Sequence, residues 1–86
     1  DKTKLTNGII KACQKRPVNA TQIANRVEAE ILNSLRTEIS STEIGEITMN
    51  ELIKADDVAY IRFASIYKDF SDVETFLEEL QKISKN

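Results

Sequence analysis

The sequence Asp57-Val58-Ala59-Tyr60-Ile61-Arg62-Phe63-Ala64-Ser65-Ile66-Tyr67-Lys68-Asp69-Phe70 predicts the helix around which the rest of the chain packs. Its apolar residues recur at helical spacing in two adjacent stripes. One stripe contains Ala59, Phe63, Ile66 and Phe70, and the other contains Tyr60, Ala64 and Tyr67. A helix that is apolar over much of its circumference is buried on several sides, so we expect this helix to be the central one.

Four further helices are predicted around it. The first runs over about residues 1–15 and is stopped by Pro17. The others begin at residues with capping-box spacing, in which a small polar residue precedes an acidic or amide residue by three positions. These pairs are Asn19 with Gln22, Ser40 (or Ser41 as the cap) with Glu43, and Ser71 with Glu74; the central helix begins at Asp56 or Asp57.

Each of these helices carries one apolar face. The residues expected to face the core are Leu5, Ile9 and Cys13; Ile23, Val27, Ile31 and Leu35; Ile44, Ile47 and Leu52; and Val73, Phe76, Leu77, Leu80 and Ile83. No segment shows sustained period-two alternation. The sequence therefore predicts an all-α bundle of short helices forming one domain over residues 1–86. The chain begins at Asp1 on helical pattern without a Met, and we expect a fragment whose front part is missing.

The composition excludes several classes of function. A formal net charge of −2 lacks the basic excess of a DNA-binding domain. Cys13 is the only cysteine and histidine is absent, so the chain has no disulfide framework, no Cys/His zinc site and no histidine base for a nucleophile. No apolar run reaches membrane-spanning length and no secretory signal is visible, so we expect a cytoplasmic protein.

Paired carboxylates are the remaining place where catalysis could reside. The candidates are Asp56-Asp57, Glu78-Glu79 and Glu43 with Glu46. Each pair falls at a predicted helix end or on a polar helix face, where capping and solvation explain it better than acid–base chemistry. We expect no enzyme activity, no catalytic residues and no metal ligands.

A few residues have both a structural and a ligand-binding interpretation. Lys4 is either solvated or a phosphate ligand, and Gly45, one turn into a helix, permits close approach of another helix or of a ligand. Arg62 needs a partner within an apolar helix, and an ion pair with Glu46, Asp57 or Asp69 is favoured over a phosphate. Tyr60 and Tyr67, two turns apart on one face, are core residues or place their hydroxyls at a ligand. These residues leave open a small-molecule sensing module and a plain helical interaction domain.

Four segments, taken in their order along the chain, favour the small-molecule sensing module over the interaction domain. They are residues 1–5 (DKTKL), 15–18 (KRPV), 41–46 (STEIGE) and 57–70. Together they resemble the ATP-cone domain of the bacterial ribonucleotide reductase transcriptional repressor family (NrdR), and the resemblance covers nearly all of the chain.

The resemblance implies a modular repressor. In this family an N-terminal four-cysteine zinc ribbon contacts operator DNA, and a C-terminal ATP cone binds ATP or dATP. The bound nucleotide changes the oligomeric state, and one oligomer represses the ribonucleotide reductase genes. This chain lacks the zinc ribbon, and with it any site for zinc, and also lacks the opening strand of the cone, so the small N-terminal sheet of the family is largely missing.

The resemblance also implies roles for individual residues. Lys4 matches a lysine that approaches phosphate, and Leu5 and Ile44 match apolar residues beside the base. Ser41 and Gly45 lie where the third helix begins against the ligand, and Tyr60 and Tyr67 match positions that face the nucleotide or a neighbouring subunit. Magnesium can accompany the triphosphate, although no dedicated cage is visible. Two alternatives are the regulatory ATP cone of a ribonucleotide reductase and a helical oligomerisation module without ligand.

Overall fold

The computed structural model describes residues 2–84, with side-chain surroundings for residues 3–83; the expected helix start at Asp1 lies outside this range. It contains five helices. They are α1 (Lys2–Ala12), α2 (Ala20–Asn33), α3 (Ser41–Ala55), α4 (Asp57–Tyr67) and α5 (Val73–Ser84). No strand occurs among the described residues, which confirms the all-α prediction.

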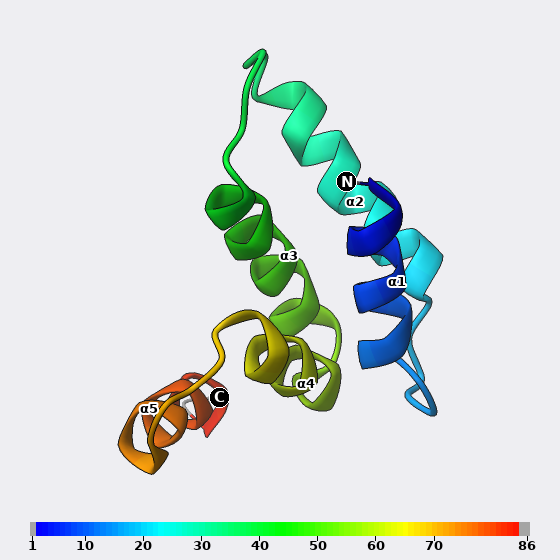
Figure 1. Cartoon of the computed structure of the whole chain (residues 1–86). Helices are drawn as coiled ribbons and strands as arrows, with labels where there is room; N and C mark the ends of the chain where they lie inside the picture. Colours follow the sequence, from blue (N-terminus) through cyan, green and yellow to red (C-terminus); the bar gives the residue numbers. More distant parts are fainter. Residues whose placement is uncertain (1, 85–86) are drawn as a thin grey trace.

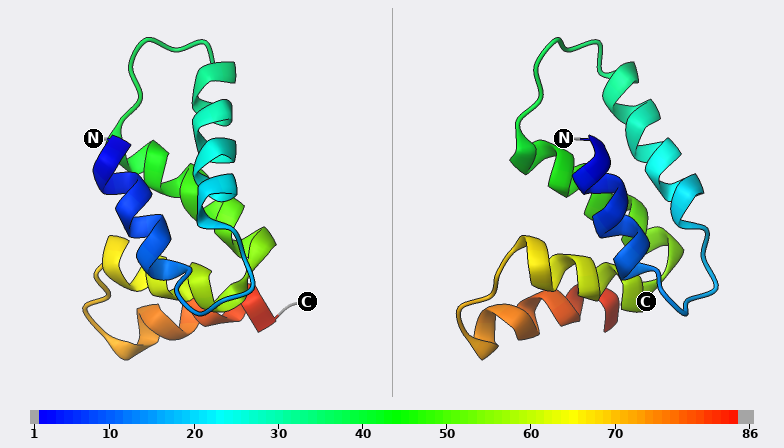
Figure 2. Two further views of the ribbon diagram at one scale, coloured as in Figure 1. Left: turned by 90° about the vertical axis from the view of Figure 1, so that its right-hand side faces the viewer. Right: turned by 45° about the vertical axis from the view of Figure 1, so that its right-hand side comes forward.

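The first four helices form a ring. α1 packs against α2 and α4, and α3 packs against the same two helices. α5 lies outside this ring, alongside α4 and running back along it (Figures 1 and 2). α4 therefore has neighbours on three sides, as expected for the central helix.

The core fills the inside of the ring. Its buried apolar residues are Ile9, Ala12, Cys13, Ile23, Val27, Met49, Leu52, Ala59, Tyr60 and Ala64. Outside α5, the prediction was wrong for Leu35, which is 90% exposed, and for Ile66, which is 84% exposed. Leu35 follows the end of α2 with a φ of 57°, so it turns away from the helix axis instead of extending the stripe.

Helix starts follow the predicted capping chemistry in three of four cases. The Asn19 side chain accepts a hydrogen bond from the Gln22 amide, and Ser40, not Ser41, forms a reciprocal capping box with Glu43. For α5 the prediction of Ser71 was wrong. The cap is Asp72, whose carboxylate accepts a hydrogen bond from the Thr75 amide at 2.8 Å.

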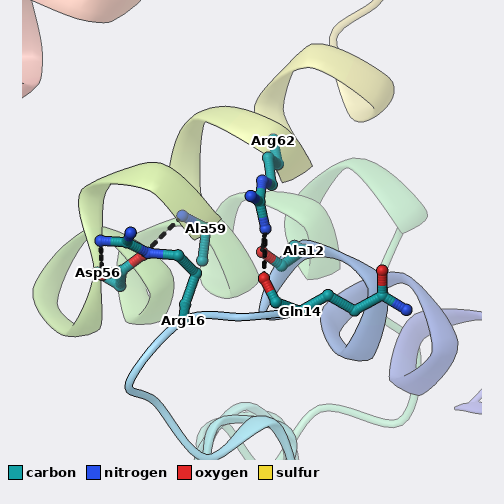
Figure 3. Close-up of polar contacts among 6 residues, drawn as sticks. All are labelled: Ala12, Gln14, Arg16, Asp56, Ala59 and Arg62. Carbon is teal, nitrogen blue, oxygen red and sulfur yellow. Dashed lines mark hydrogen bonds and ion pairs between the residues drawn. The ribbon is translucent and has the colours of Figure 1, made fainter.

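Asp56 joins α3 and α4 without a connecting loop. It is the C-cap of α3 and the N-cap of α4, and its carboxylate accepts from the Ala59 amide at 2.9 Å. The guanidinium of Arg16 donates to both oxygens of the same carboxylate, at 2.8 and 2.9 Å (Figure 3). The hydrogen bond from Arg16 is the main cause that lowers the pKa of Asp56. The KRPV segment thus anchors the α1–α2 connection to the first turn of α4.

Arg62 also ties α4 to the end of α1, but not in the way expected. Its Nη1 group donates to the backbone carbonyls of Ala12, at 3.2 Å, and Gln14, at 2.7 Å (Figure 3). The predicted ion pair with a carboxylate was wrong. The cation instead satisfies carbonyl groups left without partners at the C-terminal end of α1, where positive charge is favourable. α1 itself ends at Ala12 and not near Lys15, which has a φ of 61°.

α5 is turned away from its expected orientation. Glu79, predicted to lie on a polar face, is buried, whereas Val73 and Leu77 on the predicted core face are 71% and 50% exposed. The buried Glu79 carboxylate receives the Tyr60 hydroxyl and the ammonium groups of Lys68 and Lys82. Three donors compensate the burial of one charge, and the two that lie outside α5, Tyr60 and Lys68, favour the side of α5 that faces α4.

Candidate functional site

A cavity of about 1300 Å³ opens between α1, α3 and α4, with α2 forming its remaining side. The start of α1 contributes Lys4 and Leu5, and the first turns of α3 contribute Ser41, Ile44 and Gly45. Lys4 and Ile44, whose proximity is the condition for a shared site, therefore line the same space.

Much of the lining is apolar. Its apolar side chains come from all four helices of the ring: Leu5, Ala12, Ala24, Ile31, Ile44, Ile61, Phe63 and Ile66. Phe63 stacks against Tyr67 with ring centroids 6.1 Å apart, so the α4 wall presents flat aromatic surfaces. Such a lining favours a planar, weakly polar group over water.

Three cationic residues border this apolar lining. Lys4 and Lys11 lie seven residues apart, which is two turns, on one side of α1, and Arg62 approaches from α4. Glu28 contributes a carboxylate from α2. An apolar slot with cations along one wall is complementary to a ligand that joins a flat ring to several negative charges.

Gly45 and Tyr67 contact each other in the lining of the cavity. The Tyr67 ring lies against the bare backbone of α3 at Gly45, where a Cβ atom would be only 2.2 Å from Tyr67 Cζ. The Tyr67 hydroxyl donates to the carbonyl of Thr42 at 2.9 Å. The absence of a side chain at position 45 is therefore explained by a ring of the protein itself, although both residues also line the cavity.

Tyr60 lies elsewhere. It is 3% exposed, it is not among the cavity residues, and its hydroxyl is bonded to Glu79 of α5. Burial and the adjacent carboxylate raise the pKa of its phenol well above the usual range. The side of α4 that carries Tyr60 faces α5, so the prediction that Tyr60 binds the nucleotide has no support in this arrangement.

The structure thus brings together six of the seven residues predicted for the site. These are Lys4, Leu5, Ser41, Ile44, Gly45 and Tyr67. Sequence reasoning missed Lys11 as a cavity residue, although its spacing of seven from Lys4 places the two on one helical face. Within residues 2–84, no group of three or more His, Cys, Asp and Glu side chains is placed to hold a metal ion.

Comparison with known proteins identifies the class to which this fold and cavity correspond. The family model that describes the ATP cone domain matches residues 1–73 of this sequence, and the chain belongs to the ATP-cone family. This match ends where α5 begins.

Particular relatives within that family are transcriptional repressors. The transcriptional repressor NrdR of Caldicellulosiruptor saccharolyticus is 57% identical over 86 residues, covering 96% of this chain and 56% of the relative. The repressor NrdR of Clostridium kluyveri is 52% identical over 89 residues, covering the whole chain and 59% of the relative. That of Clostridium botulinum is 49% identical, covering 96% of the chain and 57% of the relative.

These relatives are named as regulators and not as enzymes, in agreement with the absence of predicted catalytic residues. The chain spans somewhat more than half of their length. None of the described helices combines the length and apolarity needed to cross a membrane.

Proposed function

We propose that this chain is the nucleotide-sensing domain of a cytoplasmic transcriptional repressor of ribonucleotide reductase genes. In this proposal it binds ATP or dATP in the cavity between α1, α3 and α4. The supporting observation is that one cavity unites Lys4, Leu5, Ser41, Ile44 and Gly45 from two distant segments. The repressor names of relatives that align along the chain support the regulatory role.

The chain's residues divide between the two ends of such a ligand. Leu5, Ile44 and the ring of Phe63 would contact the base, where apolar surface is buried. Lys4 and Lys11 would neutralise phosphate charge from α1. Ser41 and the first amides of α3 would face a negative charge at the positive end of the helix dipole. Magnesium would accompany the phosphates without a dedicated set of carboxylate ligands from this chain.

Regulation would follow from linkage. A nucleotide that binds one assembly of the protein more tightly than another shifts the population toward that assembly. ATP and dATP differ by one hydroxyl, and a site that hydrogen-bonds this hydroxyl distinguishes them because its loss leaves a buried polar group unpaired. We propose that the chain self-associates in this way, while operator DNA and zinc are bound by the remainder of the longer protein.

Isothermal titration of ATP and dATP with magnesium, with the mass followed by light scattering, tests the proposal. We expect saturable heat with both nucleotides, and a different mass with each in the full-length protein. Lys4→Gln should weaken binding by at least about tenfold, since a hydrogen bond to a charged group contributes about 1.5–3 kcal/mol. Lys15→Gln removes the same charge from a lysine outside the cavity lining and should leave the affinity unchanged.

Absence of heat from the unmodified protein would refute nucleotide sensing. A helical oligomerisation module without ligand would then be the remaining function. Equal weakening by Lys4→Gln and Lys15→Gln would instead place the phosphates outside this cavity.

A further inference from the structure

α5 is attached to the domain through a buried charge. The Glu79 side chain is 2% exposed, and Lys68 and Lys82 approach its oxygens at 2.8 and 2.9 Å. Tyr60 donates a further hydrogen bond to it from the first turn of α4. Two of these three donors lie outside α5, namely Tyr60 in α4 and Lys68 at the C-cap of α4, so the carboxylate is a polar connection between α5 and α4.

The remaining contacts of α5 are limited. It packs chiefly against α4, with Phe76 edge-on to Phe70 at a centroid distance of 5.4 Å. Part of its apolar face is uncovered, because Val73 and Leu77 are exposed. A helix with little buried apolar surface undocks at a lower free energy than the helices of the core. α5 also lies beyond the part of the chain that matches the ATP cone domain.

The last turn of α4 connects α5 to the cavity. Tyr67 and Lys68 are adjacent: Tyr67 reaches across the cavity to Gly45 and Thr42, whereas Lys68 reaches in the other direction to Glu79. The opposite end of α4 is fixed independently by Asp56 and Arg16. A displacement of α4 is therefore easiest at the turn that carries both Tyr67 and Lys68.

We propose that docking of α5 on α4 is coupled to nucleotide binding in the cavity, with the Tyr67–Lys68 turn as the connection. This inference rests on the proposed function. The docked helix holds the last turn of α4 in the position in which Tyr67 and Phe63 complete the cavity wall. Nucleotide binding therefore favours docked α5, and undocking of α5 weakens nucleotide binding. α5 is then the element that reports occupancy of the cavity at the outer surface of the domain.

Coupling between two sites is reciprocal, which makes the proposal testable from both directions. In the 86-residue chain, magnesium ATP should slow hydrogen exchange of the α5 amides. Glu79→Gln, which removes the charge that attracts both lysines, should speed exchange in α5. In titration it should weaken ATP binding about fivefold, at the lower end of typical allosteric couplings. The matched control is Glu78→Gln, which removes a charge from the neighbouring exposed residue and should change neither measurement.

A milder variant distinguishes loss of the contacts of Glu79 from a general folding defect. Tyr60→Phe removes one of the three donors to Glu79 without altering the ring, and its effects on exchange and affinity should have the same sign as those of Glu79→Gln and be smaller. Exchange protection of α1 to α3 shows whether each variant keeps the ring intact. Suppose that ATP binds the unmodified chain. The coupling is then refuted if ATP does not affect hydrogen exchange in α5, or if the variants bind ATP as tightly as the unmodified chain. In either case the proposed function stands. If ATP and dATP do not bind the unmodified chain, both are refuted.

Discussion

The ring of Tyr67 occupies the space in which a side chain at Gly45 would begin. An ideal Cβ at position 45 would lie 2.2 Å from Tyr67 Cζ and 2.6 Å from the hydroxyl oxygen. The other glycine, Gly8, provides a natural comparison, because a Cβ there would lie 3.5 Å from Phe63 Cε2, an ordinary van der Waals distance. The two glycines lie in helices on different sides of one cavity, but only Gly45 is required by a close approach.

Substituting alanine at these two positions should have opposite effects on stability. Gly45→Ala forces the Tyr67 ring away and should lower the free energy of unfolding by about 1–3 kcal/mol, the usual range for overpacking. Gly8→Ala should raise it by up to about 1 kcal/mol, because alanine is the better helix former. Urea denaturation measures both. In a background that carries Tyr67→Ala, the substitution Gly45→Ala should lower the free energy of unfolding by much less. If the loss caused by Gly45→Ala is as large without the ring as with it, the clash with the ring is not its cause.

Two substitutions of Asp56 should separate its ion pair with Arg16 from its role as the N-cap of α4. Asp56→Asn keeps an oxygen that can accept from the Ala59 amide but removes the charge that Arg16 contacts. Asp56→Ala also removes the N-cap of α4 and should cost about a further 1 kcal/mol. Thermal unfolding of the two variants measures the difference between them. Equal melting temperatures would mean that the cap contributes nothing.

The contact that Glu79 makes between α5 and α4 should weaken in acid. Burial opposes ionisation of Glu79, but the hydrogen bonds from Lys68, Lys82 and Tyr60 outweigh it and lower its pKa from 4.5 to about 2. A carboxylate with a lowered pKa stabilises the fold above pH 4.5, and this contribution is lost as the pH falls from about 4.5 to 2. The pKa of Lys68 is raised by its bond to Glu79, so the contribution of Lys68 is lost only in strong alkali.

Comparison of the unmodified chain with Glu79→Gln across pH tests this linkage. At pH 7 the variant should have a lower Tm by at least about 4 °C, the shift that corresponds to about 1 kcal/mol in a domain of this size. The difference should shrink progressively below pH 4.5. A difference that is independent of pH down to pH 2 would exclude ionisation of Glu79 as its origin.

Two serines that look alike in sequence should differ in importance. Ser40→Ala removes the capping box of α3 and should lower the free energy of unfolding by about 1 kcal/mol. Ser71→Ala should change it by no more than about 0.5 kcal/mol, since Asp72 caps α5 and Ser71 is exposed. Equal losses in the two variants would contradict the assignment of Asp72 as the cap.

The number of helices and most of their starts were predictable because they depend on local chemistry. Asn19, Ser40 and Asp56 each cap the helix that follows, and the apolar spacing of Ile9, Ile23 and Leu52 correctly indicated burial. Much of the candidate site was predictable too, although those residues came from the family resemblance and not from periodicity. The cavity that unites Lys4 with Ile44 is consistent with that assignment.

The errors arose where tertiary contacts override local pattern. Glu79 appeared to be a solvated residue because its donors Tyr60 and Lys68 lie in α4 and at its C-cap, outside α5. The same contacts turn Tyr60 away from the cavity. Arg62 was assigned a carboxylate partner, whereas the end of α1 offers it carbonyl groups that no sequence pattern reveals. In each case the deciding partner is at least 11 positions away in the chain.

The direct junction between α3 and α4 has a mechanical consequence for ligand capture. With Asp56 alone between the helices, the two walls meet at a corner whose geometry depends on the backbone of one residue. Asp56 has an extended backbone, so an inserted residue there would change both the direction and the rotation of α4 relative to α3 and move the aromatic wall relative to the cavity. We therefore expect an inserted residue to be tolerated better in the connection between α2 and α3 than at this corner.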